Sequence, residues 1–358
     1  MPPDPVRALL DRLRLGAGTS TEVPESLLPL IRFEGAGAWL ARRARQGAPL
    51  GPIAERLRED ARAAALATLR RDEEVARIAA RFEAGGFPYV LLKGAARSAL
   101  AAEIPLLDAR PSVDIDVLLA PGAARPAWEA LRADGYRVAA VAPPGHHHLD
   151  NLAGELGVGI EIHETTARTV PPEVAWERLG RPARTVTWQG RQVRVPPPVE
   201  LAWHQIQHAL LDGPDGFRLR HFLPVAAVAA AGADDWPLWD RRLSLGESVD
   251  DRTRRPVAAA TGRRWLEAAR WLAGLEGGSA AALHRVLRWR LACLQRGGPQ
   301  SRGLAGRAFA EGPRVELGLA AEPSLAGTPW WPRVRREAAA RAVRAAYHAY
   351  RLTAAAPR

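Results

Sequence analysis

Two aspartates one residue apart are the strongest chemical signal in this sequence. Asp114 and Asp116 lie in the apolar run 113–119, which predicts a half-buried strand. Side chains alternate along a strand, so both carboxylates are expected on one face, with their α-carbons roughly 6–7 Å apart. Carboxylates at this spacing suit Mg²⁺ or Mn²⁺, whose remaining ligands are often water and substrate phosphates. A strand rim carrying two solvated acids is the alternative.

Lys93 is the only lysine in the chain, and arginine supplies all other members of the 50 Lys and Arg residues. A lysine in this background indicates a position that needs a compact charge rather than a planar guanidinium. Lys93 follows the apolar run 89–92 and precedes Gly94, where a missing side chain lets backbone approach a ligand. A helix beginning here would offer N–H groups to phosphate. We therefore expect Lys93 and Gly94 to contact a nucleotide; a chance surface lysine is the alternative.

A third carboxylate would complete a metal site. Glu161 lies in the alternating segment 158–163 and would share a strand face with His163. We expect Glu161 to be a metal ligand or a general base, and we expect His163 to line the same cleft. The alternative is that both residues line the solvated face of an edge strand. Arg110 and Ser112 directly precede the aspartate strand and are expected at phosphate oxygens.

The remaining histidines give weaker signals. His204 and His208 are four residues apart and would share a helix face, which makes them candidates for the cleft. A zinc pair is disfavoured, because no glutamate follows His204 as in the H-E-x-x-H motif. The run 146–148 is three histidines in a Pro/Gly loop, where a polar turn is favoured over a metal site.

The periodicity of the sequence divides the chain into three regions. Residues 1–85 predict helices, the longest at 53–82 and closed by Gly85-Gly86. Residues 86–196 predict a small α/β core with a hairpin that turns at Gln189-Gly190. Its expected strands are 88–92, 113–119, 136–141 and 158–163, and its expected helices are 94–102 and 125–134. Residues 197–358 predict a helical domain with helices at 200–211, 217–231, 261–275, 280–294 and 331–355.

Composition limits the class of protein. A length of 358 residues favours two or three domains, and a hydrophobic fraction of 47% is ordinary for a globular protein. The single cysteine, Cys293, excludes an intrachain disulfide and fits a cytoplasmic location. The N-terminus lacks signal-peptide character, and no apolar run is long enough to predict a membrane span. The net charge of +11 would suit an anionic partner such as an NTP or RNA, but the arginines alternate with acids as on a solvated surface.

Four motifs together resemble a known family. They are VLLKGAA at 90–96, RPSVDIDVLL at 110–119, LRADGY at 131–136 and IEIH at 160–163. In order and spacing they are similar to the bacterial "uncharacterised nucleotidyltransferase" family of the polymerase-beta-like nucleotidyltransferase superfamily. Superfamily members usually have Gly-Ser after the first strand, where this chain has Lys93-Gly94.

The resemblance implies an α+β fold, with a polymerase-beta-like core flanked by helical regions at both ends. It implies an enzyme that moves an NMP from an NTP, with ATP the first candidate, to an acceptor and releases pyrophosphate. Asp114, Asp116 and Glu161 would then be the catalytic and metal-binding acids. The acceptor stays open among protein, peptide, RNA and small molecule, and no membrane partner is expected. A non-catalytic nucleotide- or RNA-binding module on this fold and a helical scaffold are the alternatives.

Overall fold

The computed structural model describes residues 4–295 except 17–21, 46, 48–49, 110–111, 113, 143–145, 168–169, 212–216, 248, 251–254 and 257–258. Arg110 and the helix expected at 331–355 lie outside these residues. Among the described helices, none combines the length and apolar character needed to cross a bilayer.

A five-stranded mixed sheet forms the centre of the α+β part, in the order β1-β2-β5-β4-β3. The central pair, β2 and β5, is parallel, whereas all other neighbours in this sheet are antiparallel. The strands are β1 Tyr89–Leu91, β2 Asp114–Leu119, β3 Arg137–Ala140, β4 Asn151–Ala153 and β5 Gly159–His163. Four of them confirm the expected strands, and the three-residue β4 was not predicted.

The two faces of this sheet differ in chemistry. One face carries Ile115 and Val117 of β2 and Ile160 of β5 into the main apolar core, which also takes in residues of α4 (Ala54–Ala84) and α6 (Ala124–Ala133). On the opposite face a small apolar cluster covers only one end of β1 and β2, where they meet α7 (Pro172–Ala175) and the π-turn η3 (Trp176–Gly180). The rest of that face is available for polar side chains.

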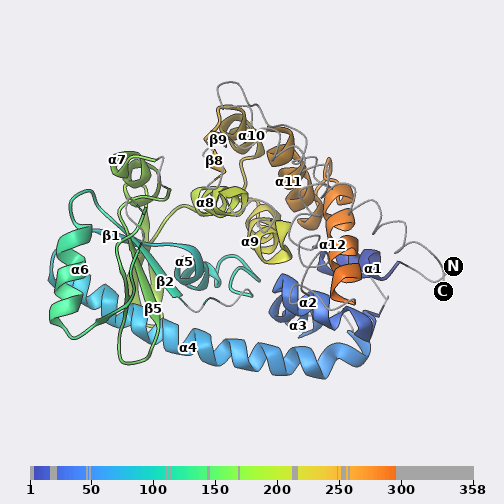
Figure 1. The fold of residues 1–358 in the computed structure, drawn as a ribbon, viewed down its shortest axis with the longest axis horizontal. Helices are drawn as coiled ribbons and strands as arrows, with labels where there is room; N and C mark the ends of the chain where they lie inside the picture. Colours follow the sequence, from blue (N-terminus) through green and yellow to red (C-terminus); the bar gives the residue numbers. More distant parts are fainter. Residues whose placement is uncertain are drawn as a thin grey trace, which may run out of the picture.

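The first and last helices of the described residues pack beside each other, away from the sheet (Figure 1). The N-terminal group contacts α12 and, through the 31-residue α4, extends beneath the sheet. Helix α5 packs between β2 and α8. The remaining elements are α1 Pro5–Leu13, η1 Glu25–Leu27, α2 Leu28–Glu34, α3 Gly37–Arg45, η2 Gly51–Ile53, α5 Lys93–Leu100, α8 Pro198–Leu211, α9 Leu219–Ala230, α10 Trp236–Ser244, β8 Val249–Asp250, β9 Arg255–Pro256, α11 Ala259–Leu272 and α12 Ala281–Leu294.

The predicted hairpin is confirmed as β6 (Arg184–Trp188) and β7 (Arg191–Val195). Gln189 and Gly190 have φ of 50° and 74°, so both turn residues are left-handed, as a two-residue hairpin turn with right-handed strand twist requires. The side chain of Gln189 also donates to Asp72 at 3.2 Å, which fixes the hairpin against α4.

Candidate active site

Parallel pairing of β2 with β5 brings two acids together. Asp116 is in register with Glu161, so the two side chains leave the same face of the sheet as direct neighbours. Asp116 is fully buried, and the side chain of Glu161 is 19% exposed. Asp116, Glu161 and His163 each offer a ligand atom within 4.8 Å of the others. The expected third carboxylate therefore lies where a shared site needs it.

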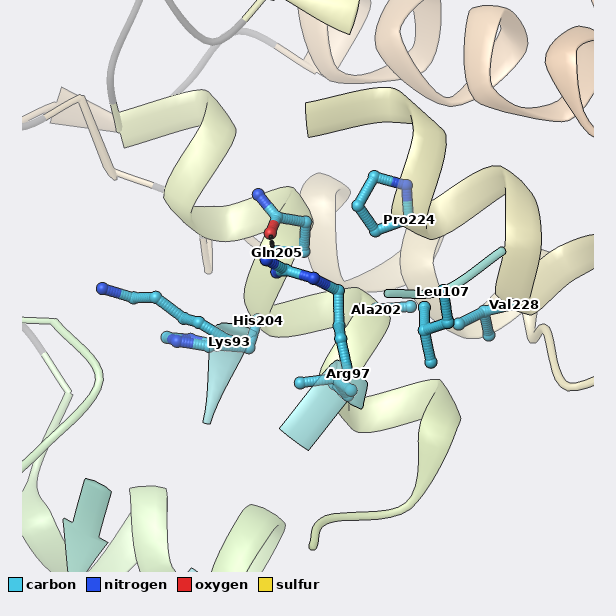
Figure 2. Close-up of a pocket in the computed structure, with 9 residues that line it drawn as sticks. Lys93, Arg97, Leu107, Ala202, His204, Gln205, Pro224 and Val228 are labelled. Carbon is cyan, nitrogen blue, oxygen red and sulfur yellow. Dashed lines mark hydrogen bonds between the residues drawn. The ribbon is translucent and has the colours of Figure 1, made fainter. Parts of the chain in front are cut away.

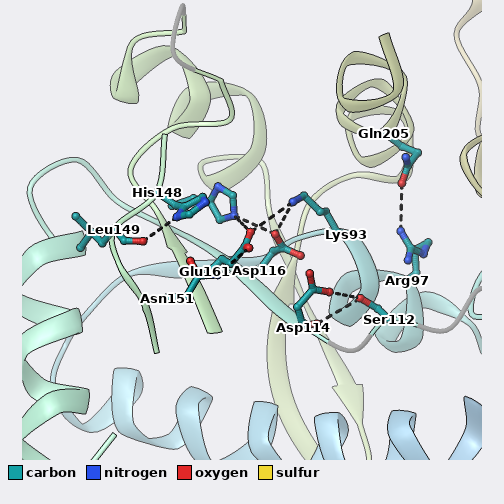
Figure 3. A network of polar contacts seen from close by, with 11 residues as sticks. Lys93, Arg97, Ser112, Asp114, Asp116, His148, Leu149, Asn151, Glu161 and Gln205 are labelled. Carbon is teal, nitrogen blue, oxygen red and sulfur yellow. Dashed lines mark hydrogen bonds and ion pairs between the residues drawn. The ribbon is translucent and has the colours of Figure 1, made fainter. Parts of the chain in front are cut away.

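Lys93 lies over these two acids (Figure 3). Its Nζ is 2.6 Å from Asp116 Oδ1 and 3.8 Å from Glu161 Oε2. Lys93 begins α5 directly after β1, and the hydrogen bond from Leu92 N to Asp116 O fixes this junction beside β2. Burial disfavours the ammonium, but Asp116 and Glu161 outweigh that effect and raise the pKa of Lys93. In this structure the ammonium offsets part of the negative charge of Asp116 and Glu161.

His163 supports the same pair from the end of β5. Its Nε2 lies 3.0 Å from Asp116 Oδ1 and 3.6 Å from Glu161 Oε2. Burial opposes the charged imidazole, but hydrogen bonds to Asp116 and Glu161 outweigh it and raise the pKa of His163. Burial likewise opposes the Asp116 carboxylate, but Lys93 and His163 hold the pKa of that group well below its usual range. Asp116 is therefore ionised despite its burial.

Asp114 shares the face of Asp116 but has a different partner. Ser112 Oγ donates to Asp114 Oδ1 at 2.6 Å, so this serine orients a carboxylate in the structure. Asp114 lies outside the compact group formed by Asp116, Glu161 and His163. The strand pattern thus placed both aspartates correctly on one face, while the polar partners of Asp116 come from α5 and β5, through Lys93 and His163.

Asn151 is a site residue that the sequence did not indicate. It lies on β4, and its Nδ2 donates to Glu161 Oε1 at 3.1 Å (Figure 3). The hydrogen bond leaves Glu161 Oε2 directed to Lys93 and His163. Because β4 is only three residues long, the pattern of the sequence alone did not reveal this strand.

Gly94 has a packing reason for lacking a side chain. A Cβ at this position would lie 2.2 Å from Ser112 Cβ and 2.4 Å from Ser112 Oγ, which is closer than atoms can approach. Gly94 therefore lets the start of α5 lie against the segment that leads into β2. This contact places Ser112 beside Asp114, independently of any contact between Gly94 and a ligand.

A pocket adjoins Lys93 on the side of α8 and α9 (Figure 2). It is lined by Lys93, Arg97, Leu107, Leu201, Ala202, His204, Gln205, Pro224 and Val228. His204 is 3% exposed, and within the described part of the chain neither ring nitrogen has a hydrogen-bond partner. Burial and the nearby Lys93 lower the pKa of His204 well below its usual value. This neutral imidazole faces a cavity of about 10 Å³, which has room for one water molecule but not for a nucleotide.

Two further groups of histidines lie near the site. His208, one helical turn after His204, stacks on His221 with ring centroids 6.2 Å apart. His147 and His148 pack against His163, with centroid distances of 5.2 and 5.4 Å. Burial and the neighbouring histidines lower the pKa of His147 to about 2, so its ring is neutral at physiological pH.

Comparison with known sequences identifies the family of the chain. The family described as "Uncharacterised nucleotidyltransferase" matches residues 21–248. The chain belongs to this family. The match includes β1, β2 and β5 and thus all the acids of the site, and it supports a general role in nucleotidyl transfer. No curated protein and no solved structure shows a significant match to the chain.

The acids of this family member have the chemistry of a divalent-cation site. Oxygen ligands suit Mg²⁺ and Mn²⁺. Asp116 Oδ2 is buried and has no hydrogen-bond partner among the described residues, although its other oxygen has two. An orphaned carboxylate oxygen inside a protein is costly unless a cation or a donor satisfies it. The donor set and this unpaired oxygen fit a divalent metal ion.

Proposed function

We propose that the chain is a metal-dependent nucleotidyltransferase that moves an NMP from an NTP to an acceptor and releases pyrophosphate. The observation that carries this proposal is the register of Asp116 with Glu161, beside Asp114 and beneath Lys93. The mixed sheet, with the acids on one face and α4 and α6 on the other, supports a polymerase-beta-like core. We take ATP as the first NTP to test.

Asp116, Glu161 and Asp114 would hold Mg²⁺ or Mn²⁺. The bound ion would neutralise phosphate oxygens and stabilise the charge that develops as pyrophosphate leaves. Asp116 suits this task because its carboxylate stays ionised in a buried position. Ser112 and Asn151 orient the two outer acids by hydrogen bonds at 2.6 and 3.1 Å. Such supporting contacts strongly affect metal affinity in protein sites.

The ammonium of Lys93 would contact phosphate oxygens of the triphosphate. This ammonium lies at the acids and borders the pocket beside α8, and a phosphate bound at the acids would be within reach of its flexible stem. His204 lines the same pocket with both ring nitrogens buried. That pocket has a volume of about 10 Å³, so we assign His204 to a hydrogen bond with a single water molecule next to Lys93.

Glu161 fits a ligand better than a general base. The hydrogen bond with His163 lowers its pKa against the opposing effect of burial, and Lys93 adds to the lowering. A carboxylate with a lowered pKa holds a cation well but accepts a proton poorly. We therefore assign Glu161 to cation binding, and the acceptor hydroxyl would lose its proton to another group or to water.

The test uses the full-length protein, α-³²P-labelled NTPs, Mg²⁺ or Mn²⁺ and cell extract as a source of acceptors. We expect labelled product and pyrophosphate with the wild type, and a loss of roughly two orders of magnitude or more in Asp116→Asn and Glu161→Gln. Glu164→Gln, which changes an exposed acid beside His163, is the matched control and should keep full activity. Metal-dependent ATP binding without pyrophosphate release would instead indicate a nucleotide-binding module.

A further inference from the structure

Three consecutive histidines form a cluster beside the acidic site. His146, His147 and His148 precede β4, and their rings lie 4.1 to 5.1 Å from one another, centroid to centroid. The backbone of this segment is attached to β5, because Leu149 N donates to Ile162 O at 2.9 Å and Glu164 N donates to His147 O at 3.1 Å. The cluster is therefore held by the sheet and is not a free loop.

The ring nitrogens of the cluster are close enough to share one ion. Each of the three histidines offers a ligand nitrogen, and these atoms all lie within 4.8 Å of one another. All three side chains are half-buried, so an ion could enter from solvent. Three imidazoles with one further position left for water form a common zinc coordination set.

One hydrogen bond already sets the tautomer of His148 that a metal ion would need. His148 Nδ1 lies 2.7 Å from Leu149 O, and because a carbonyl oxygen only accepts, Nδ1 must carry the proton. In the neutral ring, Nε2 then has its lone pair free for a metal. Metal-binding histidines in proteins usually donate their second nitrogen to a carbonyl or carboxylate in this way.

His163 connects the cluster to the acids. Its Nε2 hydrogen-bonds Asp116, while its Nδ1 is buried without a partner among the described residues. The rings of His147 and His148 are the ones that pack against it. An ion at the cluster would fix these rings and so hold His163 in the orientation that contacts Asp116.

We propose that His146, His147 and His148 form a second metal site, which binds a divalent transition-metal ion of the Zn²⁺ type. This site is distinct from the carboxylate site, because imidazole ligands favour Zn²⁺ and its neighbours whereas oxygen ligands favour Mg²⁺. Its role is to position His163, and through it Asp116. The site does not depend on whether the protein transfers a nucleotide.

The experiment adds Co²⁺ to full-length, untagged, EDTA-treated protein and follows the visible absorption of the ion, with Zn²⁺ displacement as a second measurement. We expect one equivalent of Co²⁺ to bind with the intense visible bands of four-coordinate geometry, and Zn²⁺ to displace it. His147→Gln and His148→Gln should each weaken binding at least tenfold. Circular dichroism in EDTA should show these variants folded, since the changed rings are only half-buried; His146→Gln is a further variant of the same kind.

Two controls separate this site from other histidines and from the acids. His284→Gln alters a histidine that bonds Asp4, the N-cap of α1, and Asp114→Asn alters the carboxylate site. With excess Mg²⁺ present to occupy the carboxylates, both variants should keep the four-coordinate Co²⁺ bands of the wild type. The proposal is overturned if no stoichiometric binding occurs, or if binding survives in the His147 and His148 variants. Loss of Co²⁺ binding in Asp114→Asn would also overturn it, because the ion would then lie at the carboxylates.

Discussion

Lys93 does more in this protein than a surface cation could. Its backbone is left-handed, with φ of 41°, a conformation that is costly for a residue with a side chain. The strain is maintained because it directs the ammonium to Asp116 at 2.6 Å. An internal cation of this kind keeps the buried Asp116 ionised. In the proposed function a metal ion would replace it, and the flexible stem would turn to phosphate. Both tasks suit lysine better than arginine, which agrees with its isolation in an arginine-rich sequence.

The first prediction concerns Lys93→Met. The change leaves Asp116 buried with only His163 as a charge partner, so it should lower the free energy of unfolding by about 3 kcal/mol in EDTA. It also removes the cation that competes with Mg²⁺, so the rise in melting temperature on adding Mg²⁺ should exceed that of the wild type. Thermal and urea unfolding with and without Mg²⁺ measure both effects. Lys93→Arg keeps the charge, so its free energy of unfolding should lie between those of the wild type and Lys93→Met. A Lys93→Met protein as stable as the wild type would contradict the argument.

The second prediction is a pH dependence that comes from His163. The pKa of His163 is raised in the folded protein, so the folded state holds the proton more tightly than the unfolded chain. This contribution to stability is complete below the ordinary pKa of about 6.5 and is lost as pH rises through the folded pKa. Urea unfolding in EDTA from pH 6 to 9 should therefore show falling stability, and His163→Gln should remove that part of the slope. His284→Gln should keep it; equal slopes in the wild type and His163→Gln would exclude the mechanism.

At the scale of elements, the sequence predicted the strands that carry the site better than it predicted which strands pair. Alternation placed Asp114 and Asp116 on one face, and the apolar run before Lys93 placed it at a strand–helix junction; the structure confirms both. The pairing of β2 with β5 joins residues 45 positions apart in sequence, such as Asp116 and Glu161. Local periodicity carries no signal for a pairing of this kind. Helix α10 and strand β4 were missed because each is short and has mixed polarity.

The contact between α5 and the segment before β2 gives the third prediction. Gly94→Ala would place a Cβ 2.2 Å from Ser112 Cβ, and both atoms are close to backbone that cannot rotate away. Moving α5 should cost roughly 1–3 kcal/mol and displace Ser112 from Asp114. We expect lower urea stability and lower Mg²⁺ affinity by calorimetry. Gly159→Ala is the matched control, because it lies opposite Asp114 on β5, has no atom within 4 Å of an added Cβ, and should change neither quantity. Equal behaviour of the two variants would show that this packing is not needed.

At the scale of the whole molecule, the helical part joins the N-terminal helices to α9 and α12. Glu34 at the end of α2 is completely buried, accepts from Leu219 N at 2.8 Å, and pairs with Arg290 of α12 at 2.8 Å. Arg290 also donates to Phe217 O at 2.7 Å. One carboxylate therefore connects α2, the start of α9 and α12, which are far apart in sequence. Since α9 and α8 form one wall of the pocket beside Lys93, this junction supports the site from a distance.

The last prediction tests this junction with Glu34→Leu. Removing the carboxylate leaves the Arg290 charge in the core, at 2% exposure, and should lower the free energy of unfolding by about 3–5 kcal/mol. The double variant Glu34→Leu/Arg290→Leu removes both charges and should recover part of that loss, because apolar side chains can replace a buried pair. Asp11→Asn, which breaks an exposed pair with Arg7, is the control and should change stability by less than about 1 kcal/mol. Urea denaturation of the four proteins measures these differences. A double variant less stable than Glu34→Leu would mean that Arg290 acts mainly through its hydrogen bond to Phe217 O. The pair of Glu34 with Arg290 would then not be the contact that joins α2 to α12.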